Sequence, residues 1–247
     1  MRSLSAAELL NVWEQGLAQL PVQRALTLLV AACPEIPSED LARLSIGQRD
    51  ALLLTLREWL FGSQVQSVAT CPVCGDRLEL CFQVADIRVD TSNPVETCSL
   101  QVADYEVQFR LPNSLDLLAM TTSSSLCDTE TASPAKMLLH RCLLNISSEG
   151  KEQSWEQLPP SAINEVVQQM AQIDAQADVQ LHLDCPNCQH QWQTVFDIVS
   201  FFWTEIHAWA ERTLSEVHAL ATAYGWGEQD ILAMSPYRRR LYLEMLL

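Results

Sequence analysis

Two Cys-Pro-x-Cys motifs constrain the fold of this chain more than any other feature of its sequence. The first contains Cys71 and Cys74, and the second contains Cys185 and Cys188. A Cys-x-x-Cys turn supplies two thiolates at neighbouring corners of a tetrahedron, and a structural zinc ion takes four such ligands with no open position. The 110 residues between the motifs are no obstacle, because the entropy lost on closing a loop rises only slowly with its length. The sequence therefore predicts one structural zinc ion that both motifs share.

The residues beside the two motifs are only partly equivalent. Gly75 follows Cys74 and suits the left-handed backbone that such a turn often needs, whereas Gln189 stands at the matching place and is less favourable. His182 and His190 are close enough in sequence to act as substitute ligands, but a lone histidine beside a metal site is more often a bystander. Five further cysteines share no ligand spacing and are predicted to be core or surface thiols: Cys33, Cys81, Cys98, Cys127 and Cys142.

Both motifs also share a wider sequence context. Each lies between two predicted strands and is followed by a phenylalanine and an Asp-Ile pair, which are Phe82 with Asp86-Ile87 and Phe196 with Asp197-Ile198. This pattern predicts a shared strand–turn–strand unit. A redox Cys-Pro-x-Cys pair belongs instead at a helix N-terminus, where the dipole lowers the thiol pKa. The context therefore favours zinc, with redox thiols and unliganded buried cysteines as the alternatives.

The charge balance bears on the class of partner. The chain of 247 residues has 31 acidic and 15 basic side chains and a formal net charge of −16. Proteins that bind nucleic acid use Lys and Arg to displace counterions from phosphates, so this balance argues against a nucleic-acid partner. Because paired Cys-x-x-Cys motifs are also frequent in zinc-ribbon modules that act on nucleic acid, such a module is the alternative function despite this charge. A salt-dependent gel shift would support it.

The sequence shows no sign of a targeting segment, a membrane span or a catalytic motif. Residues 1–8 include an acid where a signal peptide needs an apolar core, and no apolar run approaches the roughly 18 residues that span a bilayer. An odd number of cysteines fits a reducing compartment better than a disulfide framework. No phosphate-binding loop, zinc-protease motif or nucleophile elbow occurs, and a zinc ion with four thiolates has no site for a reactive water. We therefore expect a cytoplasmic, non-enzymatic protein that makes no contact with membranes.

Helix signals dominate both ends of the chain. Ser5 with Glu8, and Ser45 with Gln48, form capping boxes before apolar residues at helical spacing. The longest predicted helix covers residues 198–224, whereas strand patterns flank the two cysteine motifs and form a hairpin at 100–111. The predicted fold class is α+β, mostly helical, with a central zinc-ribbon-like β element made from the two Cys-x-x-Cys knuckles.

Five regions are predicted along the chain. They are an N-terminal helical region (1–64), the first knuckle with β-hairpins (65–112), a helical region with polar loops (113–178), the second knuckle packing with the first (179–199) and a C-terminal helical region (200–247). Within the third region, the pattern predicts a loop at 121–133, a helix at 134–143 and a polar stretch at 147–160.

Several segments in combination are typical of one family. They are Phe61-Gly62 before the first motif, the strand at 105–112, and a run from the second motif through Trp203-Thr204-Glu205-Ile206 and Tyr224-Gly225-Trp226 to Ser235-Pro236-Tyr237-Arg238-Arg239. With this arrangement the chain resembles the baseplate hub assembly chaperones of T-even-type phages and of phage-derived extracellular contractile injection systems. The likeness covers residues 45–112 and 174–247.

The resemblance implies an assembly role without catalysis. A protein of this kind would hold baseplate hub, spike or tape-measure proteins until they join, either in the cytoplasm or in association with the particle. Tryptophan and arginine are enriched in interface hot spots, so the segment 224–240 is predicted to be the contact region. Its candidate contact residues are Trp226, Tyr237, Arg238, Arg239 and Arg240. For the three arginines, a solvated helix face near a helix C-terminus is the simpler interpretation.

Overall fold

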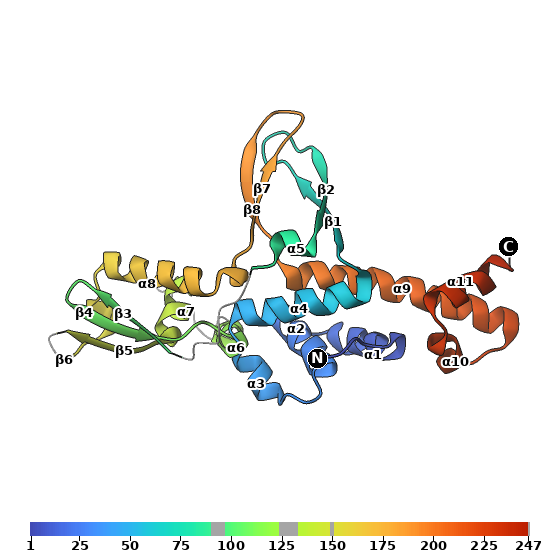
Figure 1. Cartoon of the computed structure of the whole chain (residues 1–247), viewed down its shortest axis with the longest axis horizontal. Helices are drawn as coiled ribbons and strands as arrows, with labels where there is room; N and C mark the ends of the chain where they lie inside the picture. The colour runs from blue at the N-terminus through green and yellow to red at the C-terminus, as the bar shows by residue number, and fades with distance from the viewer. Residues whose placement is uncertain (90–96, 124–132, 149–150, 247) are drawn as a thin grey trace. The chain divides into compact units, whose positions relative to one another are not determined.

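The computed structural model describes residues 1–89, 97–123, 133–148 and 151–246 (Figure 1). The fold is α+β and mostly helical with small antiparallel sheets, which confirms this part of the predicted class. The chain divides into two compact units, one made of Met1–Ile36 with Asp197–Leu247 and one made of Pro37–Phe196. Among the described helices, none is both long enough and apolar enough to cross a bilayer.

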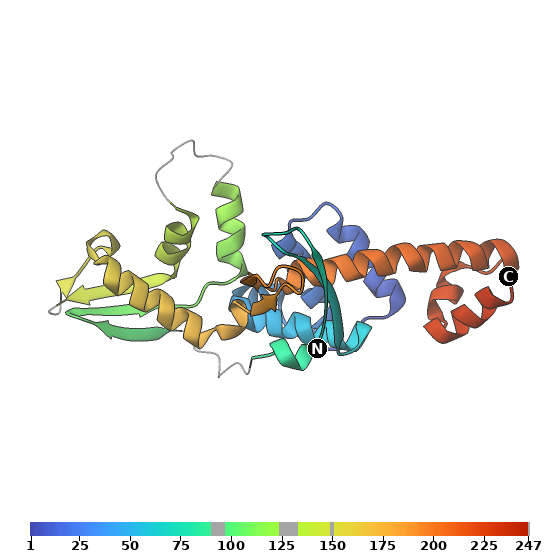
Figure 2. The same ribbon diagram turned by 90° about the horizontal axis from the view of Figure 1, so that it is seen from above.

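The first unit is helical and is built from two distant parts of the chain. Its helices are α1 (Ala6–Gly16), α2 (Pro21–Ala32), α9 (Ile198–Tyr224), α10 (Glu228–Ala233) and α11 (Pro236–Glu244). Figure 2 shows α10 and α11 folded back at the C-terminal end of α9. The predicted capping box of Ser5 and Glu8 begins α1, Asp197 caps α9, and Gly225 ends α9 with a left-handed φ of 69°.

A glycine lets α1 approach α9 closely. A β-carbon at Gly16 would lie 2.0 Å from the Trp203 ring, so a larger residue does not fit there. The indole N–H of Trp13 donates to Nδ1 of His207 at 3.0 Å, and the Arg24 guanidinium lies 4.7 Å from the centre of the Trp203 ring. Trp203 therefore anchors the core of the first unit, as its position on the long predicted helix indicates.

The second unit contains six α-helices in the part of the chain that the structure describes. They are α3 (Ser38–Arg43), α4 (Ile46–Phe61), α5 (Val84–Ile87), α6 (Ser114–Ser123), α7 (Pro134–Cys142) and α8 (Pro160–Ile173), with 3₁₀ turns at Trp155–Gln157 and Ala175–Ala177. Ser45 and Gln48 form the predicted capping box of α4. The Ser45 hydroxyl also donates to the buried Asp174 at 2.8 Å, and this carboxylate accepts from the Gly47 backbone N–H at 3.0 Å. The start of α4 is thus tied to the segment that follows α8.

The described part of the second unit holds three antiparallel sheets. Two are hairpins, β1 (Gln64–Thr70) with β2 (Arg77–Gln83), and β7 (Gln180–Asp184) with β8 (Gln191–Val195). The third has the strand order β3–β4–β5–β6, with bounds Cys98–Val102, Tyr105–Phe109, Leu143–Ser148 and Lys151–Glu152. The predicted hairpin at 100–111 is confirmed as β3–β4, which turns at Ala103-Asp104.

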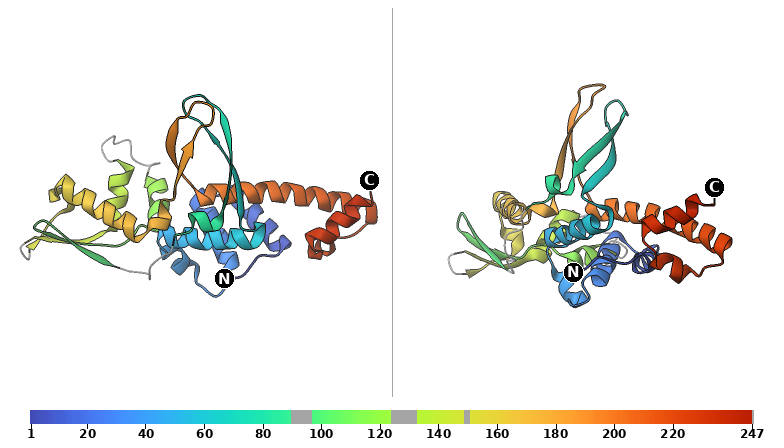
Figure 3. Two further views of the ribbon diagram at one scale, coloured as in Figure 1. Left: turned by 45° about the horizontal axis from the view of Figure 1, so that its top comes forward. Right: turned by 45° about the vertical axis from the view of Figure 1, so that its right-hand side comes forward.

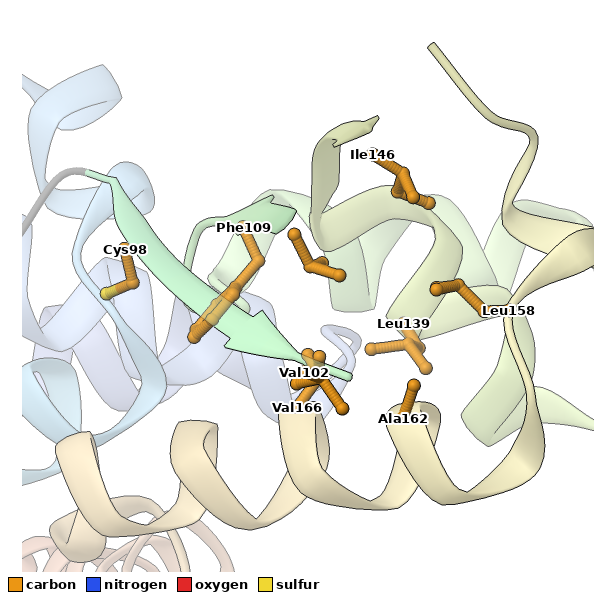
Figure 4. Close-up of a cluster of buried hydrophobic side chains, with 9 residues drawn as sticks. Cys98, Val102, Phe109, Leu139, Ile146, Leu158, Ala162 and Val166 are labelled. Carbon is orange, nitrogen blue, oxygen red and sulfur yellow. The ribbon is translucent and has the colours of Figure 1, made fainter. Parts of the chain in front are cut away.

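The four-stranded sheet has its own hydrophobic core (Figure 4). Val107 and Phe109 of β4 are fully buried, and they pack in one cluster with Ile146 of β5 and with Ala162 and Val166 of α8. Alternate residues of β4 face this core, as the period of two along a strand requires. The β3–β4 hairpin therefore belongs to a different sheet from β1–β2, its neighbour in the sequence.

Strand β5 is the main departure from the sequence-based secondary structure. The predicted helix at 134–143 ends at Cys142, and Leu143–Ser148 continues as a strand that pairs with β4. Polar residues surround the single buried side chain of this strand, Ile146, so pairing with β4 and not a local pattern defines it. The predicted loop at 121–133 lies mostly outside the described residues, although α6 extends to Ser123.

Candidate metal centre

The two cysteine motifs form equivalent turns, which we call the first knuckle (residues 71–75) and the second knuckle (residues 185–189). In each, the first cysteine donates its backbone N–H across the turn, Cys71 to the Asp76 carbonyl at 2.8 Å and Cys185 to the His190 carbonyl at 2.9 Å. The strand pairs that lead into the knuckles have the same register, since the residue before the first cysteine pairs with the residue three after the second. The predicted strand–turn–strand unit therefore occurs twice.

The two hairpins lie side by side (Figures 1 and 3). The rings of Phe82 and Phe196 meet edge to face at the hairpin ends away from the knuckles, with centroids 5.7 Å apart. Both phenylalanines come eight residues after the second cysteine of their motif. The shared sequence context thus has a structural meaning, because it supplies the packing that aligns one hairpin with the other.

The knuckles bring all four cysteine sulfurs together. Cys71 Sγ lies 3.6 Å from Cys188 Sγ, and Cys74 Sγ lies 3.5 Å from Cys185 Sγ. All four sulfurs fall within 4.8 Å of one another. Zinc–sulfur bonds of about 2.3 Å in a tetrahedron place the sulfurs about 3.8 Å apart. The donor set and its dimensions therefore fit a single tetrahedral metal ion.

Backbone N–H groups also surround the sulfurs. Burial opposes ionisation of Cys71, but the N–H groups of Cys74 and Val73 donate to its sulfur, and its pKa falls to about 7. At Cys188 the N–H of His190 favours the thiolate, yet desolvation and the neighbouring cysteine sulfurs outweigh it and raise the pKa to about 12. Without a metal ion the cluster therefore retains protons that a bound cation would displace.

Both knuckles use a left-handed residue directly after their second cysteine. Gly75 has a φ of 75° and Gln189 a φ of 59°. The glutamine therefore adopts the left-handed backbone conformation that normally favours glycine. Their N–H groups make the same bond, to the carbonyl of Cys71 at 3.0 Å and of Cys185 at 2.9 Å. The second knuckle keeps its geometry despite the steric penalty of a β-carbon.

Replacing Gln189 by glycine is expected to stabilise the protein. Glycine adopts positive φ without steric cost and loses more entropy on folding, so the net gain in unfolding free energy is about 0.5–1 kcal/mol. Urea denaturation of the metal-loaded chain measures it. The reverse change, Gly75→Gln, is the matched control and should lose a similar amount, because a β-carbon at Gly75 meets no atom within 4 Å and only the backbone conformation matters. A neutral Gly75→Gln would contradict the explanation.

The other cysteines and the nearby histidines lie outside the cluster. Cys33, Cys98 and Cys142 are buried, and burial raises the pKa of each thiol, for Cys142 to about 11. Cys81 is exposed on β2, whereas Cys127 lies outside the described residues. The His190 ring stacks on Trp192, and His182 contacts Gln193. Within the described chain, the metal-ligand group around the knuckles consists of the four predicted cysteines.

The candidate contact residues of the segment 224–240 have different surroundings. Trp226 is half-buried, with its ring stacked 4.5 Å from that of Tyr224. The Arg239 side chain is buried and donates to Glu216 at 3.0 Å, so it packs α11 on α9. Three side chains remain accessible to a partner: Tyr237, Arg238 and Arg240.

One polar cluster was not anticipated from the sequence. The side chain of Asp116 is 1% exposed and forms ion pairs with Arg110 and Arg141. Asn113 and Asp116 also exchange side chain–backbone hydrogen bonds at the start of α6. The Asn-x-x-Asp spacing is a helix-capping signal that marks this start, but no local pattern indicates that the two arginines converge there.

The fold and the site define an α+β protein with a four-cysteine cluster close enough to hold one metal ion. The chain belongs to the family of T4 bacteriophage base plate proteins, whose model matches residues 9–203. The match includes all four cysteines of the cluster. Comparison with curated proteins and with solved structures gave no match. Membership of this family supports a structural or assembly role in a phage baseplate, in contact with other baseplate proteins.

Proposed function

We propose that this chain is a non-catalytic, chaperone-like assembly factor for the baseplate hub of a phage-tail-like contractile injection system. It acts in the cytoplasm and holds hub, spike or tape-measure proteins through protein–protein contacts until they join the particle. The observation that carries the proposal is the family match over residues 9–203, which extends through both cysteine hairpins. A cluster with four thiolates leaves no coordination position for a reactive water, which supports a role without catalysis.

Zinc is the ion that we propose for the cluster. Four cysteine sulfurs at tetrahedral spacing are the ligand set that zinc takes in structural sites. Each knuckle continues into a strand, so neither cysteine pair has the helix N-terminus that lowers thiol pKa in redox motifs. The ion would join two hairpins distant in sequence and stabilise the second unit as a scaffold.

The accessible part of the segment 224–240 is the proposed contact surface, and its removal is expected to block assembly. The test uses a strain that encodes every other component of the particle but lacks the gene for this chain, which is then supplied from a plasmid. With Arg238→Ala and Arg240→Ala together, we expect at least tenfold fewer complete particles by electron microscopy, because exposed arginines contribute to hot spots.

The matched control is Arg212→Ala, which removes an exposed arginine of α9 in the same unit and should leave assembly normal. Normal particle numbers with the double variant would contradict the placement of the contact surface. Mass spectrometry of purified particles tests the chaperone role separately. A chaperone is absent from finished particles, so a stoichiometric copy of the chain in each baseplate would replace the proposal with a structural role.

A further inference from the structure

A pocket of the second unit carries positive charge in an acidic protein. It has a volume of about 630 Å³, and three arginines and two aspartates line it: Arg43, Arg110, Arg141, Asp40 and Asp116. These five side chains have a formal charge of +1, whereas the whole chain has a formal charge of −16. The pocket is thus a place where an anionic group can approach the protein favourably.

Arg110 and Asp116 form the rigid wall of the pocket. The Arg110 guanidinium donates to both Asp116 carboxylate oxygens, at 2.6 and 2.8 Å. It also donates to the backbone carbonyls of Leu111 and Arg141, at 3.1 and 3.0 Å. These bonds occupy both of its terminal nitrogens. Arg110 is therefore committed to the fold and holds the pocket in shape.

The other two arginines retain unused donors. Arg141 donates to Asp116 through Nε at 3.0 Å, and neither of its terminal nitrogens has a hydrogen-bond partner among the described residues. Arg43 is exposed at the end of α3, and no described residue forms an ion pair with it. Asp116 is shared by two arginines, so one positive charge of this group stays uncompensated.

Aliphatic side chains complete the lining. Leu44, Leu111 and Leu115 border the same pocket, and Leu115 is 42% exposed. A ligand that fits would offer a carboxylate to the guanidinium forks and an apolar group to the leucines, since carboxylates bind arginine in a bidentate geometry. A phosphate polymer fits less well, because its many closely spaced charges meet a chain of strong negative charge.

We propose that this pocket binds a segment of a partner protein in which an acidic side chain adjoins an aliphatic one. The segment would come from another baseplate protein, and only in this respect does the inference rest on the proposed function. The binding assay described next does not depend on particle assembly. A negative result in this assay would therefore contradict the pocket inference without contradicting the proposed function, and the reverse also holds.

A nitrogen-15 NMR titration of the full-length chain tests the pocket. The probe is the acetylated, amidated peptide Gly-Leu-Glu-Leu-Glu-Gly, and the same peptide with glutamine for glutamate is its control. We expect the acidic peptide to shift the Arg141 Nε–H resonance with a Kd at or below about 1 mM, a weak affinity typical of a short segment. The glutamine peptide should bind at least tenfold more weakly.

Variants separate the pocket from general charge effects. Arg43→Gln removes no interaction that the structure describes, so it leaves the fold intact and should weaken binding of the acidic peptide at least fivefold. Arg212→Gln removes an exposed arginine of the other unit and should leave binding unchanged.

Four outcomes would overturn the inference. The first two are no binding of the acidic peptide at concentrations up to about 5 mM, and equal binding of the acidic and glutamine peptides. The third is an equal loss of affinity in Arg43→Gln and Arg212→Gln. The fourth is displacement of the peptide by inorganic phosphate or a short oligonucleotide at a tenfold lower concentration than the peptide. Sedimentation adds a fifth, because a dimer that Arg43→Gln abolishes would assign the pocket to a second copy of this chain.

Discussion

Replacing Cys185 by serine is expected to abolish zinc binding by the whole cluster, so that the metal ion no longer links the two hairpins. A hydroxyl is a poor zinc ligand, and the three remaining thiolates do not close a structural site. Structural zinc contributes on the order of 10 kcal/mol to folding, so we expect the melting temperature of the second unit to fall by more than about 10 °C. Zinc content by mass spectrometry should drop from one ion per chain to almost none. Cys71→Ser should have the same effect, since the two knuckles share one ion.

Cys81→Ser is the matched control for this experiment. Cys81 lies on β2, in the hairpin that carries Cys71, is exposed and stands outside the cluster, so its replacement should leave both zinc content and melting temperature unchanged. Two zinc ions lost separately by the Cys71 and Cys185 variants would show independent knuckles. A wild-type chain that contains no zinc and forms disulfides between the knuckle cysteines would favour redox chemistry instead.

Gly47→Ala is expected to destabilise the protein although alanine is the better helix former. Helix propensity alone predicts a gain of about 1 kcal/mol. In the structure, however, a β-carbon at Gly47 would lie 2.2 Å from Asp174 Oδ1 and 2.9 Å from the Ala177 backbone nitrogen. Backbone and a buried carboxylate have little room to move, so the unfolding free energy should fall by about 2–3 kcal/mol. Urea denaturation with an unchanged m-value measures the loss.

A double-mutant cycle separates this clash from other causes. Asp174→Ala removes the partner of the Ser45 hydroxyl and of the Gly47 N–H and should itself cost about 2 kcal/mol. In that background Gly47→Ala should cost at least about 1 kcal/mol less, because the closest atom is gone. Additive losses would count against the steric explanation. Gly227→Ala, where the nearest atom lies 3.5 Å from the new β-carbon, should cost less than about 1 kcal/mol.

The helices with local start signals could be predicted from the sequence. The capping boxes at Ser5 and Ser45 and the glycine at 225 are short-range features that act through neighbouring backbone groups, and the structure places α1, α4 and α9 where they indicate. Helix α3 has only six residues, too few for a periodic pattern, and was not predicted. Strand β5 depends on a ladder with β4, which no pattern within residues 143–148 encodes.

The candidate metal centre could be predicted to a similar degree. Ligand identity follows from spacing, and the structure brings together the four predicted cysteines. The left-handed backbone at Gln189 follows from its place after Cys188, which matches that of Gly75, although glutamine disfavours this conformation. Burial of Arg239 was missed, since it depends on a bond to Glu216 from another helix. The same holds for the arginine pocket, whose members come from separate elements.

The first unit is built from two segments far apart in the sequence, and this limits the order in which the chain can fold during synthesis. Residues 1–36 are synthesised before the continuous second unit, and their packing partners on α9 are synthesised after it, from residue 198 onward. At a translation rate of about 5–20 residues per second, the start of α9 is synthesised roughly 10–30 s after α1 and α2. Throughout that interval the side chain of Leu10, which in the finished protein is buried in one cluster with Ala210, Val217 and Leu220 of α9, lacks these partners. The newborn N-terminal helices are therefore expected to be clients of the host's ribosome-associated chaperones.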